Sequence, residues 1–340
     1  MSKLGVTMPG LNQPIDAFPR MAKMAEDAGF DSVWDYEFYR NPLVILGMTA
    51  QTTSTIPLGT GLVTAAGRSP FVMANAAADV DEASGGRLIL GISTGAAAFT
   101  DLMNGSDGSH PVARTREYVT LLRKIWDWTA GEGAADGETL GGQFYKFTAP
   151  EINPFGRRPL ARKRIPIYTA ALRQAMARLG GEISDGVIGF MLPARYLREV
   201  YLPNIAEGAR KAHRSPADVD VASETVCSVS NDRAEAYRRA RLQVGIYISH
   251  PVCAPLAEYM GLAKDREACL EAMAARGPMA LADVVSDELI DAFSISGTPD
   301  ECRKKFEEYR DCLPHVLLHP PYMPVLTQEE SEEVTSRGVV

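Results

Sequence analysis

The chain has 340 residues, of which 46% are hydrophobic and 23% are charged, a composition typical of a globular protein. Its formal net charge of −8 and the absence of a long basic stretch argue against nucleic acid as a partner. No apolar run approaches the ~18 residues of a membrane span, and MSKLGVTMPG has no signal-peptide pattern, so we expect a cytoplasmic protein without membrane contact.

Short apolar runs alternate with longer helical patterns along the whole chain. Predicted strands lie, in chain order, at 3–8, 30–34, 56–63, 85–93, 164–170, 184–190, 218–230 and 315–321. Predicted helices lie at 15–28, 42–51, 70–83, 115–128, 172–179, 194–213 and 232–248. Gly29 is expected to end the first helix, and the pair Gly180-Gly181 to end the fifth. Before the last strand, Thr298 and Glu301 predict a helix start with a capping box.

Most of the predicted strands are too apolar to have one face in water, which is typical of parallel strands covered by helices. Eight such strand–helix units predict an α/β fold, a (β/α)8 TIM barrel with insertions. A doubly wound open sheet is the alternative, but no GxGxxG motif follows the first strand. We expect one domain over 1–325 with insertions near 130–164 and 250–292, a short hairpin at 143–147, and a tail at 326–340.

Active sites of such barrels lie at the C-terminal ends of the strands. Small residues collect after three of these ends, in the segments GTGLVTAAG, GISTGAAAF and YTAALR. They leave space for a flat, bulky ligand above the backbone, although glycine and alanine also allow tight helix–strand packing. The cysteines are scattered without a CxxC motif, and the histidines lack metal-ligand spacing, so we expect reduced thiols and no metal site.

Three segments carry a resemblance to a known family, namely AEDAGFDSVWDYEF, LGTGLVTAAGRSPFVMANAAADVDEASGGRLILGISTG and IPIYTAALRQAMARLGGEISDGVIGF. They resemble the bacterial luciferase-like family of flavin and deazaflavin oxidoreductases, over roughly residues 4–190. The resemblance implies a TIM barrel, usually a homodimer, that binds FMN or coenzyme F420 at the C-terminal mouth. We expect apolar residues of the third helix, Val72, Met73 and Val80, at the dimer interface.

The resemblance also implies which residues hold the cofactor. Gly61-Leu62 matches a non-proline cis peptide under the middle ring, and Thr94 matches a position near the phosphate or the ribityl chain. Residues 170–173 match a turn whose N–H groups hold the phosphate at a helix N-terminus. The expected cofactor-binding residues are Gly61, Leu62, Val63, Thr64, Ser93, Thr94, Gly95, Ala170, Ala171, Leu172, Arg173 and Met176.

The segment ALRQAMARLGGEISDG indicates which cofactor the resemblance favours. It is closer to the AAxGPxMxxLAGEIADG style of F420-dependent members than to FMN-dependent ones, although Arg173-Gln174 replaces the GP pair. We therefore expect F420-dependent hydride transfer to or from a small organic substrate. The alternatives are an FMN-dependent monooxygenase that uses O₂ and a separate flavin reductase, and a flavin-binding homologue without catalysis.

The predicted acid lies in WDYEFYR, after the second strand, where many F420-dependent members have a histidine. Glu37 falls about at that position, and a carboxyl group in an apolar pocket can donate a proton near neutral pH. A loop ion pair between Glu37 and Arg40 would give Glu37 a structural role instead. Asp35 is the next candidate, Tyr39 is expected to line the substrate pocket, and Glu224 is a weaker candidate.

Overall fold

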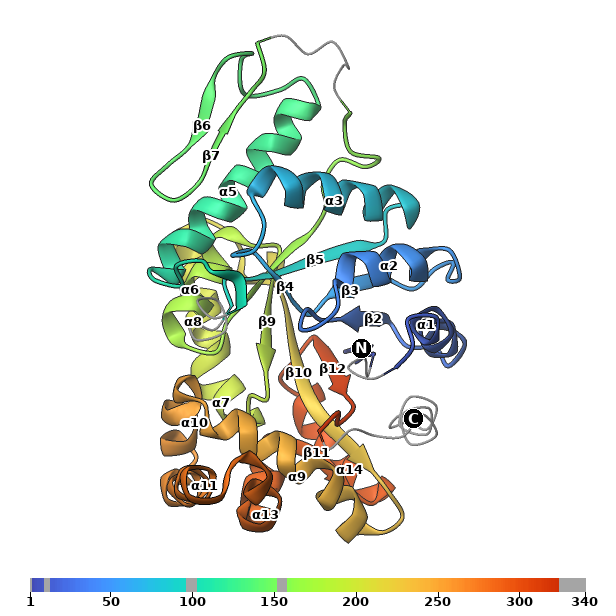
Figure 1. Ribbon diagram of the computed structural model, residues 1–340, viewed down its shortest axis with the longest axis vertical. Helices are drawn as coiled ribbons and strands as arrows, with labels where there is room; N and C mark the ends of the chain where they lie inside the picture. Colours follow the sequence, from blue (N-terminus) through green and yellow to red (C-terminus); the bar gives the residue numbers. More distant parts are fainter. Residues whose placement is uncertain (1, 9–12, 96–102, 152–157, 324–340) are drawn as a thin grey trace.

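A computed structural model of the chain describes residues 2–8, 13–95, 103–151 and 158–323. Its centre is a barrel of parallel strands with helices around it (Figure 1). The barrel strands are β1 (Lys3–Thr7), β2 (Ser32–Asp35), β3 (Leu58–Thr60), β5 (Leu88–Ser93), β8 (Ile167–Ala170), β9 (Gly186–Phe190), β10 (Asp220–Val229) and β12 (His315–His319). β10 pairs with β9 and β12, and β12 pairs with β1, which closes the barrel. The predicted TIM barrel is confirmed; the expected tail at 326–340 lies outside the described residues.

Helices between consecutive strands cover the outside of the barrel. They are α1 (Ala17–Asp27), α2 (Pro42–Ala50), α3 (Pro70–Ala83), α5 (Pro111–Thr129), α6 (Gln174–Ile183), α7 (Ala194–Tyr196), α8 (Leu202–Lys211), α9 (Arg233–Ser249) and α14 (Pro299–Arg310). A π-helical turn at Leu197–Tyr201 joins α7 to α8. The predicted start of α14 is confirmed, because Thr298 and Glu301 form the capping box. Among the described residues, no helix is both long enough and apolar enough to cross a bilayer.

Helix α6 does not end at Gly180-Gly181, as the sequence predicted, but continues through both glycines. A side chain at Gly181 would overlap the backbone carbonyl of Ile205 in α8, and one at Gly208 of α8 would overlap that of Arg178 in α6. These glycines therefore allow the backbones of α6 and α8 to touch. The close approach outweighs the roughly 1 kcal/mol by which a glycine inside a helix is less favourable than alanine.

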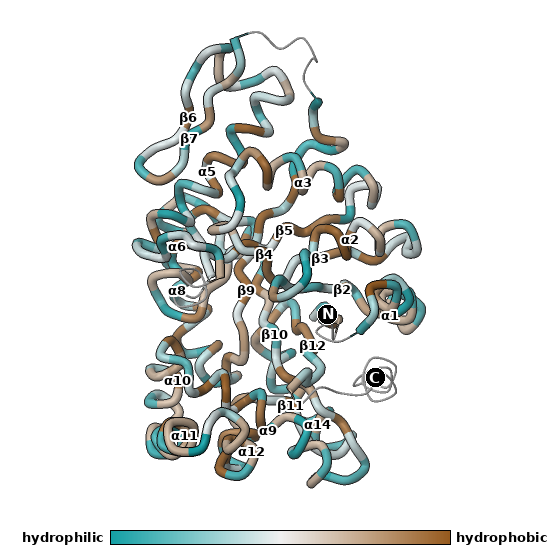
Figure 2. The backbone as a smooth tube through the Cα atoms, in the orientation of Figure 1, coloured by the Kyte–Doolittle hydropathy of each residue, from teal (hydrophilic) through white to brown (hydrophobic). Residues whose placement is uncertain are grey.

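Large aromatic rings fill the barrel interior, and glycines on neighbouring strands make room for them. Trp34 on β2 and Tyr168 on β8 are both buried, with ring centroids 5.9 Å apart. A side chain at Gly59 would overlap the Trp34 ring, and one at Gly186 would crowd the Tyr168 ring. Strand β5 beside these rings is strongly hydrophobic (Figure 2), as expected for a strand covered on both faces.

Two insertions lie at opposite ends of the molecule in Figure 1. Strands β6 (Thr139–Gly141) and β7 (Lys146–Thr148) form the predicted hairpin. Glu117 of α5 fixes its turn by accepting hydrogen bonds from the N–H groups of Gln143, Phe144 and Tyr145. The second insertion contains α10 (Ala254–Tyr259), α11 (Ala263–Arg276), α12 (Leu281–Val284) and α13 (Asp287–Phe293). It ends in β11 (Ser294–Gly297), which the sequence did not predict and which pairs with the second half of β10.

Two of the three residues expected at a dimer interface belong to the core of the chain itself. Met73 and Val80 of α3 are buried, so neither is available to a second copy, and this part of the expectation is wrong. Val72, the residue before Met73, is 54% exposed. Ile15, at which the first helix was predicted to begin, precedes α1 and is 43% exposed.

Replacing Gly59 by alanine should destabilise the protein, because the added methyl group overlaps the buried Trp34 ring, which has no free space to move into. We expect the free energy of unfolding to fall by about 1–3 kcal/mol, the usual cost of overpacking. Gly47→Ala is the matched control, since Gly47 lies inside α2 and the new methyl group meets no atom within 4 Å. That variant should gain up to about 1 kcal/mol. Urea denaturation of both variants checks this, and equal stabilities would contradict it.

Candidate active site

The C-terminal ends of the barrel strands form a mouth whose floor follows from the alternation of side chains along each strand. Trp34 and Tyr168 face the barrel axis, so Tyr36 and Ala170, two positions further along, face it as well. The floor residues, one layer above the aromatic core, are Thr7, Tyr36, Gly61, Ala170, Phe190, Glu224 and His319. One half of the mouth carries small side chains, and the other carries aromatic and ionisable ones.

The small-residue half contains the predicted bulge after β3. The Gly61-Leu62 peptide is cis, as predicted. The Gly61 N–H donates to the Asp35 carbonyl (2.7 Å), and the Glu37 N–H donates to the Leu62 carbonyl (2.9 Å), so the loop after β2 holds the bulge. After the bulge, β4 (Val63–Thr64) pairs with β5. The expected cofactor residues that are partly exposed at this edge are Leu62, Thr64, Ser93, Thr94, Gly95 and Ala170, while Gly61 and Val63 are buried.

The turn between β8 and α6, predicted to hold a phosphate, is fixed by two tyrosines. The Ala171 carbonyl accepts a hydrogen bond from the Tyr201 hydroxyl (3.1 Å), and the Leu172 carbonyl accepts one from the Tyr196 hydroxyl (3.3 Å). In a planar trans peptide the C=O and the following N–H point in opposite directions. The N–H groups of Leu172 and Arg173 therefore point away from these tyrosines, and an anion can approach them at the start of α6.

The Arg173 side chain connects this turn to the second insertion. Arg173 is exposed, and its guanidinium donates to the carbonyls of Pro251 (3.1 Å) and Val252 (3.4 Å). The predicted contact between Arg173 and a phosphate would require the guanidinium to leave these carbonyls. Met176, the last of the expected cofactor residues, is half-buried and packs from α6 against the core.

Glu37, the predicted proton donor, is restrained on both of its carboxylate oxygens. They pair with the Arg68 guanidinium at 2.6 and 2.9 Å, and Oε2 also accepts from the Thr64 N–H at 2.6 Å. The expected ion pair between Glu37 and Arg40 is wrong, because Arg40 donates to the Gln13 carbonyl (2.6 Å). A bidentate guanidinium fixes a carboxylate in position, so this geometry suits Glu37 to anchoring the bulge.

Asp35 and Tyr39, the other two candidates for catalysis, do not belong to the floor. Tyr39 is 76% exposed at the surface. Asp35 follows the axis-facing residue of β2 and therefore points toward the helix layer. It is buried, and its Oδ2 has no hydrogen-bond partner in the part of the chain that the structure describes. Burial raises the pKa of Asp35 to about 7; the charges of Glu224 and Arg40 raise and lower it respectively, and the Tyr36 N–H lowers it.

Aromatic rings occupy the other half of the mouth. Tyr36 stacks on Tyr322 (ring centroids 5.5 Å apart) and lies 5.4 Å from the His319 ring. Phe190 meets His319 edge-on at 5.4 Å and contacts Tyr247 at 4.6 Å. The hydroxyl groups of Tyr247 and Tyr322 are hydrogen-bonded to each other. This cluster joins the ends of β2, β9 and β12 to α9 and gives the mouth an aromatic wall of tilted and edge-on rings beside the small-residue half.

Glu224 stands at the boundary between the two halves. Its side chain is buried; Oε1 accepts a hydrogen bond from the Thr7 hydroxyl (3.2 Å), and Oε2 lies 3.5 Å from His319 Nδ1. Gly61 lies directly against it, since a side chain at Gly61 would overlap Glu224 Oε1. An ionisable pair thus lies under the aromatic wall and next to the bulge.

Glu224 was only a weaker candidate than Glu37 from the sequence, and His319 was not among the predicted site residues. Alternation is the signal that could have found both. Glu224 lies two positions after Ala222, an axis-facing residue of β10, and His319 lies two positions after Leu317, an axis-facing residue of β12. An ionisable residue on the axis face, next to the C-terminal end of a barrel strand, points into the mouth.

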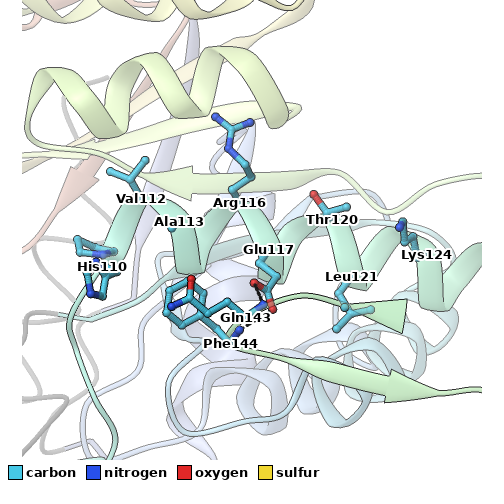
Figure 3. Close-up of a pocket in the computed structure, with 12 residues that line it drawn as sticks. His110, Val112, Ala113, Arg116, Glu117, Thr120, Leu121, Lys124, Gln143 and Phe144 are labelled. Carbon is cyan, nitrogen blue, oxygen red and sulfur yellow. Dashed lines mark hydrogen bonds between the residues drawn. The ribbon is translucent and has the colours of Figure 1, made fainter. Parts of the chain in front are cut away.

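A cavity of about 660 Å³ lies elsewhere, along the outer face of α5 beside the hairpin turn (Figure 3). Its lining includes Val112, Lys124 and Phe144, together with Arg116, which is already paired with Glu182 through two hydrogen bonds of 2.7 and 2.8 Å. None of its lining residues belongs to the mouth. We therefore place the chemistry at the mouth, where the ionisable and small residues converge.

This arrangement has counterparts among known proteins. A family model described as luciferase-like monooxygenase matches residues 3–315. The chain is 34% identical over 308 residues to a 5,10-methylenetetrahydromethanopterin reductase of Methanolobus tindarius, covering 88% of each protein. The solved coenzyme F420 dependent tetrahydromethanopterin reductase of Methanopyrus kandleri superposes with a TM-score of 0.80 at 25% identity, covering 98% of this chain and 97% of that one. An F420-dependent secondary alcohol dehydrogenase, with a TM-score of 0.76 at 20% identity over 100% of this chain and 98% of that one, supports the fold alone.

The raised pKa of Asp35, about 7 against an ordinary 3.8, makes stability depend on pH. Between these values the folded chain holds a proton that the unfolded chain has lost, so stability falls as pH rises through this window. The loss between about pH 5 and about pH 8 should be on the order of 2–3 kcal/mol. Asp35→Asn, which resembles the protonated form, should remove it.

Urea denaturation of the wild type and of Asp35→Asn at about pH 5 and about pH 8 measures the difference. Glu207→Gln, which removes a carboxylate that is 62% exposed on α8, is the control and should behave like the wild type. If the free energy of unfolding changed with pH equally in the wild type and in Asp35→Asn, the raised pKa of Asp35 would be contradicted.

Proposed function

Since this chain belongs to the luciferase-like monooxygenase family, we propose that it is an F420-dependent oxidoreductase that transfers a hydride to or from a small organic substrate. The observation that carries the proposal is the division of the mouth. Small, partly exposed residues form one half, and an aromatic wall above a buried carboxyl group forms the other. This division suits two flat partners held side by side.

The small-residue half has the shape and the polarity that a deazaflavin requires. The ring system would lie over the bulge at Gly61-Leu62 and beside Thr94 and Ala170, where the described side chains other than Leu62 are small. The phosphate would accept from the N–H groups of the turn after β8, whose direction the two tyrosines fix. When bound and reduced, F420 supplies a hydride from C5. The chain's own residues would hold the cofactor and the substrate side by side.

The substrate would lie on the aromatic wall, over Tyr36 and Phe190. A flat group that contains a C=O or C=N bond fits such a wall, and stacking there would place its carbon toward the small-residue half. Reduction of such a bond needs a proton at the heteroatom as well as a hydride at the carbon. The buried ionisable groups of the floor lie on the side where that proton is needed.

Two other functions are separated by a binding experiment. An FMN-dependent monooxygenase would bind FMN in preference to F420 and would consume O₂ when supplied with reduced flavin. A flavin-binding homologue without catalysis would bind a cofactor and turn over no substrate. Purified protein titrated with F420 and with FMN, followed by cofactor fluorescence, should bind F420 more tightly. Tighter binding of FMN would contradict the proposal.

Replacing Arg173 should weaken F420 binding if its guanidinium moves from the carbonyls of Pro251 and Val252 to the phosphate. A charge-assisted contact contributes about 1.5–3 kcal/mol, so the dissociation constant of Arg173→Ala should rise about tenfold or more. Arg195→Ala is the matched control, because Arg195 is an exposed arginine of α7 paired with Glu199. An unchanged constant in Arg173→Ala would leave the backbone N–H groups as the phosphate contact.

We also propose that the protein is a homodimer, joined through α2 and α3. Val44 on α2 is 53% exposed and Val72 on α3 is 54% exposed, and the two helices are neighbours. Exposed apolar side chains on adjacent helices are typical of an interface. Sedimentation at micromolar concentration should show a dimer for the wild type and a monomer for the double variant Val44→Asp, Val72→Asp. A monomeric wild type would contradict the proposal.

A further inference from the structure

We infer that Glu224 and His319 form the acid/base pair of this site, holding one proton under the aromatic wall and exchanging it with the heteroatom of the substrate. The inference rests on the proposed function for the identity of the reaction, and on the geometry of the floor for the identity of the pair. Glu37 is paired with Arg68 instead, whereas Glu224 lies against His319.

The two side chains belong to neighbouring strands and face the same axis. β10 and β12 are parallel partners, with Glu224 opposite Leu317 and Val226 opposite His319. Glu224 is 4% exposed and His319 is 3% exposed, and Oε2 lies 3.5 Å from Nδ1. His319 Nδ1 has no hydrogen-bond partner within the described part of the chain. A proton placed between these two atoms therefore satisfies both, and burying either group charged without the other would be unfavourable.

The groups around Glu224 hold the carboxyl in place without neutralising it. The Thr7 hydroxyl of β1 donates to Oε1 at 3.2 Å, and the backbone of Gly61 lies against the same oxygen. Tyr247 of α9 is a further neighbour, and burial raises its pKa to about 12, so its phenol stays neutral at physiological pH. Asp35 lies on the other face of β2, where burial raises its pKa to about 7, and its charge interacts with that of Glu224.

The groups around His319 are the rings of the aromatic wall. The ring centroids of Tyr36, which follows β2, and of Phe190 on β9 each lie 5.4 Å from that of His319. The ring centroid of Tyr322, in the segment after β12, lies 5.3 Å from it. Burial raises the pKa of Tyr322 well above its ordinary value, so this phenol stays neutral as well. Glu224 is thus the nearest group of opposite charge available to a protonated His319 among the described residues.

The proton step balances in both directions. In reduction, a hydride from the bound cofactor would form the new C–H bond, and the π electron pair of the C=O or C=N bond would move to the heteroatom. The heteroatom would take the proton held by Glu224 and His319, so that one bond to hydrogen breaks in the pair and one forms in the product. Water would return the proton when the product leaves. In oxidation, the pair would take the proton from the alcohol or amine, and the hydride would pass to the oxidised cofactor.

The pairing can be tested without cofactor, by NMR titration of the histidine rings. The chain has five histidines, and His319→Gln identifies the His319 signal by its loss. In Glu224→Gln the pH at which this signal changes should fall by about one unit or more, because a neighbouring carboxylate no longer favours the protonated ring. The surface variant Glu207→Gln should leave it unchanged, and the same comparison in an Asp35→Asn background removes the titration of Asp35.

An unmoved His319 signal in Glu224→Gln would overturn the pairing. Glu224→Asp covers the case in which Glu224→Gln does not fold. It keeps the charge but moves it away from the ring on a shorter side chain, so the pH at which the His319 signal changes should fall below that of the wild type. An unmoved His319 signal in Glu224→Asp would then overturn the pairing.

Activity separates a failure of this inference from a failure of the proposed function. With F420 and an active substrate, Glu224→Gln should lower kcat about a hundredfold, the scale for losing a positioned acid, and should remove one limb of the pH profile while the F420 dissociation constant stays within about twofold. Normal turnover with an unchanged pH profile would overturn the inference. A wild type that does not bind F420 would overturn the proposed function, whereas a coupled His319 signal would still support the pair.

Discussion

The contact between the Glu224 carboxyl and the backbone of Gly61 joins the two halves of the mouth. A carboxyl group can reach the barrel axis from β10 only where the strand end across from it has no side chain, and Gly61 meets that condition. The same residue begins the bulge over which the cofactor ring is proposed to lie. Because one glycine serves both purposes, the acid/base pair and the cofactor surface are positioned together, and neither can shift without the other.

The layer beneath shows the same principle with larger groups. Trp34 and Tyr168 fill the axis where Gly59 and Gly186 leave space, and this rigid aromatic layer supports the floor. Above it, side chains become small over β3, β5 and β8 and aromatic over β2, β9 and β12. The asymmetry gives the mouth two chemically different surfaces. The ion pair between Glu37 and Arg68 then anchors the bulge from outside the floor.

The barrel could be predicted from the sequence because most of its strands are too apolar to have one face in water, a local property that each segment carries by itself. The cis peptide could be predicted because a family motif marks it. The ion-pair partner of Glu37 could not be predicted, since Arg68 is 31 positions away and the loop geometry decides which arginine lies beside the carboxylate. The pair Gly180-Gly181 was misread as a helix end because the same residue permits both a stop and a close helix contact. Glu224 was underrated because its importance depends on which face of β10 meets the axis.

The account makes the small space at Gly61 essential to cofactor binding, and the F420 dissociation constant of Gly61→Ala tests this most directly. The added methyl group would overlap the Glu224 carboxyl and push the carboxyl and the bulge apart. Where crowding of about 1–3 kcal/mol falls on the cofactor-bound state, binding should weaken about fivefold or more, while Gly47→Ala, remote in α2, binds as the wild type does. F420 binding by Gly61→Ala with the affinity of the wild type would contradict the account.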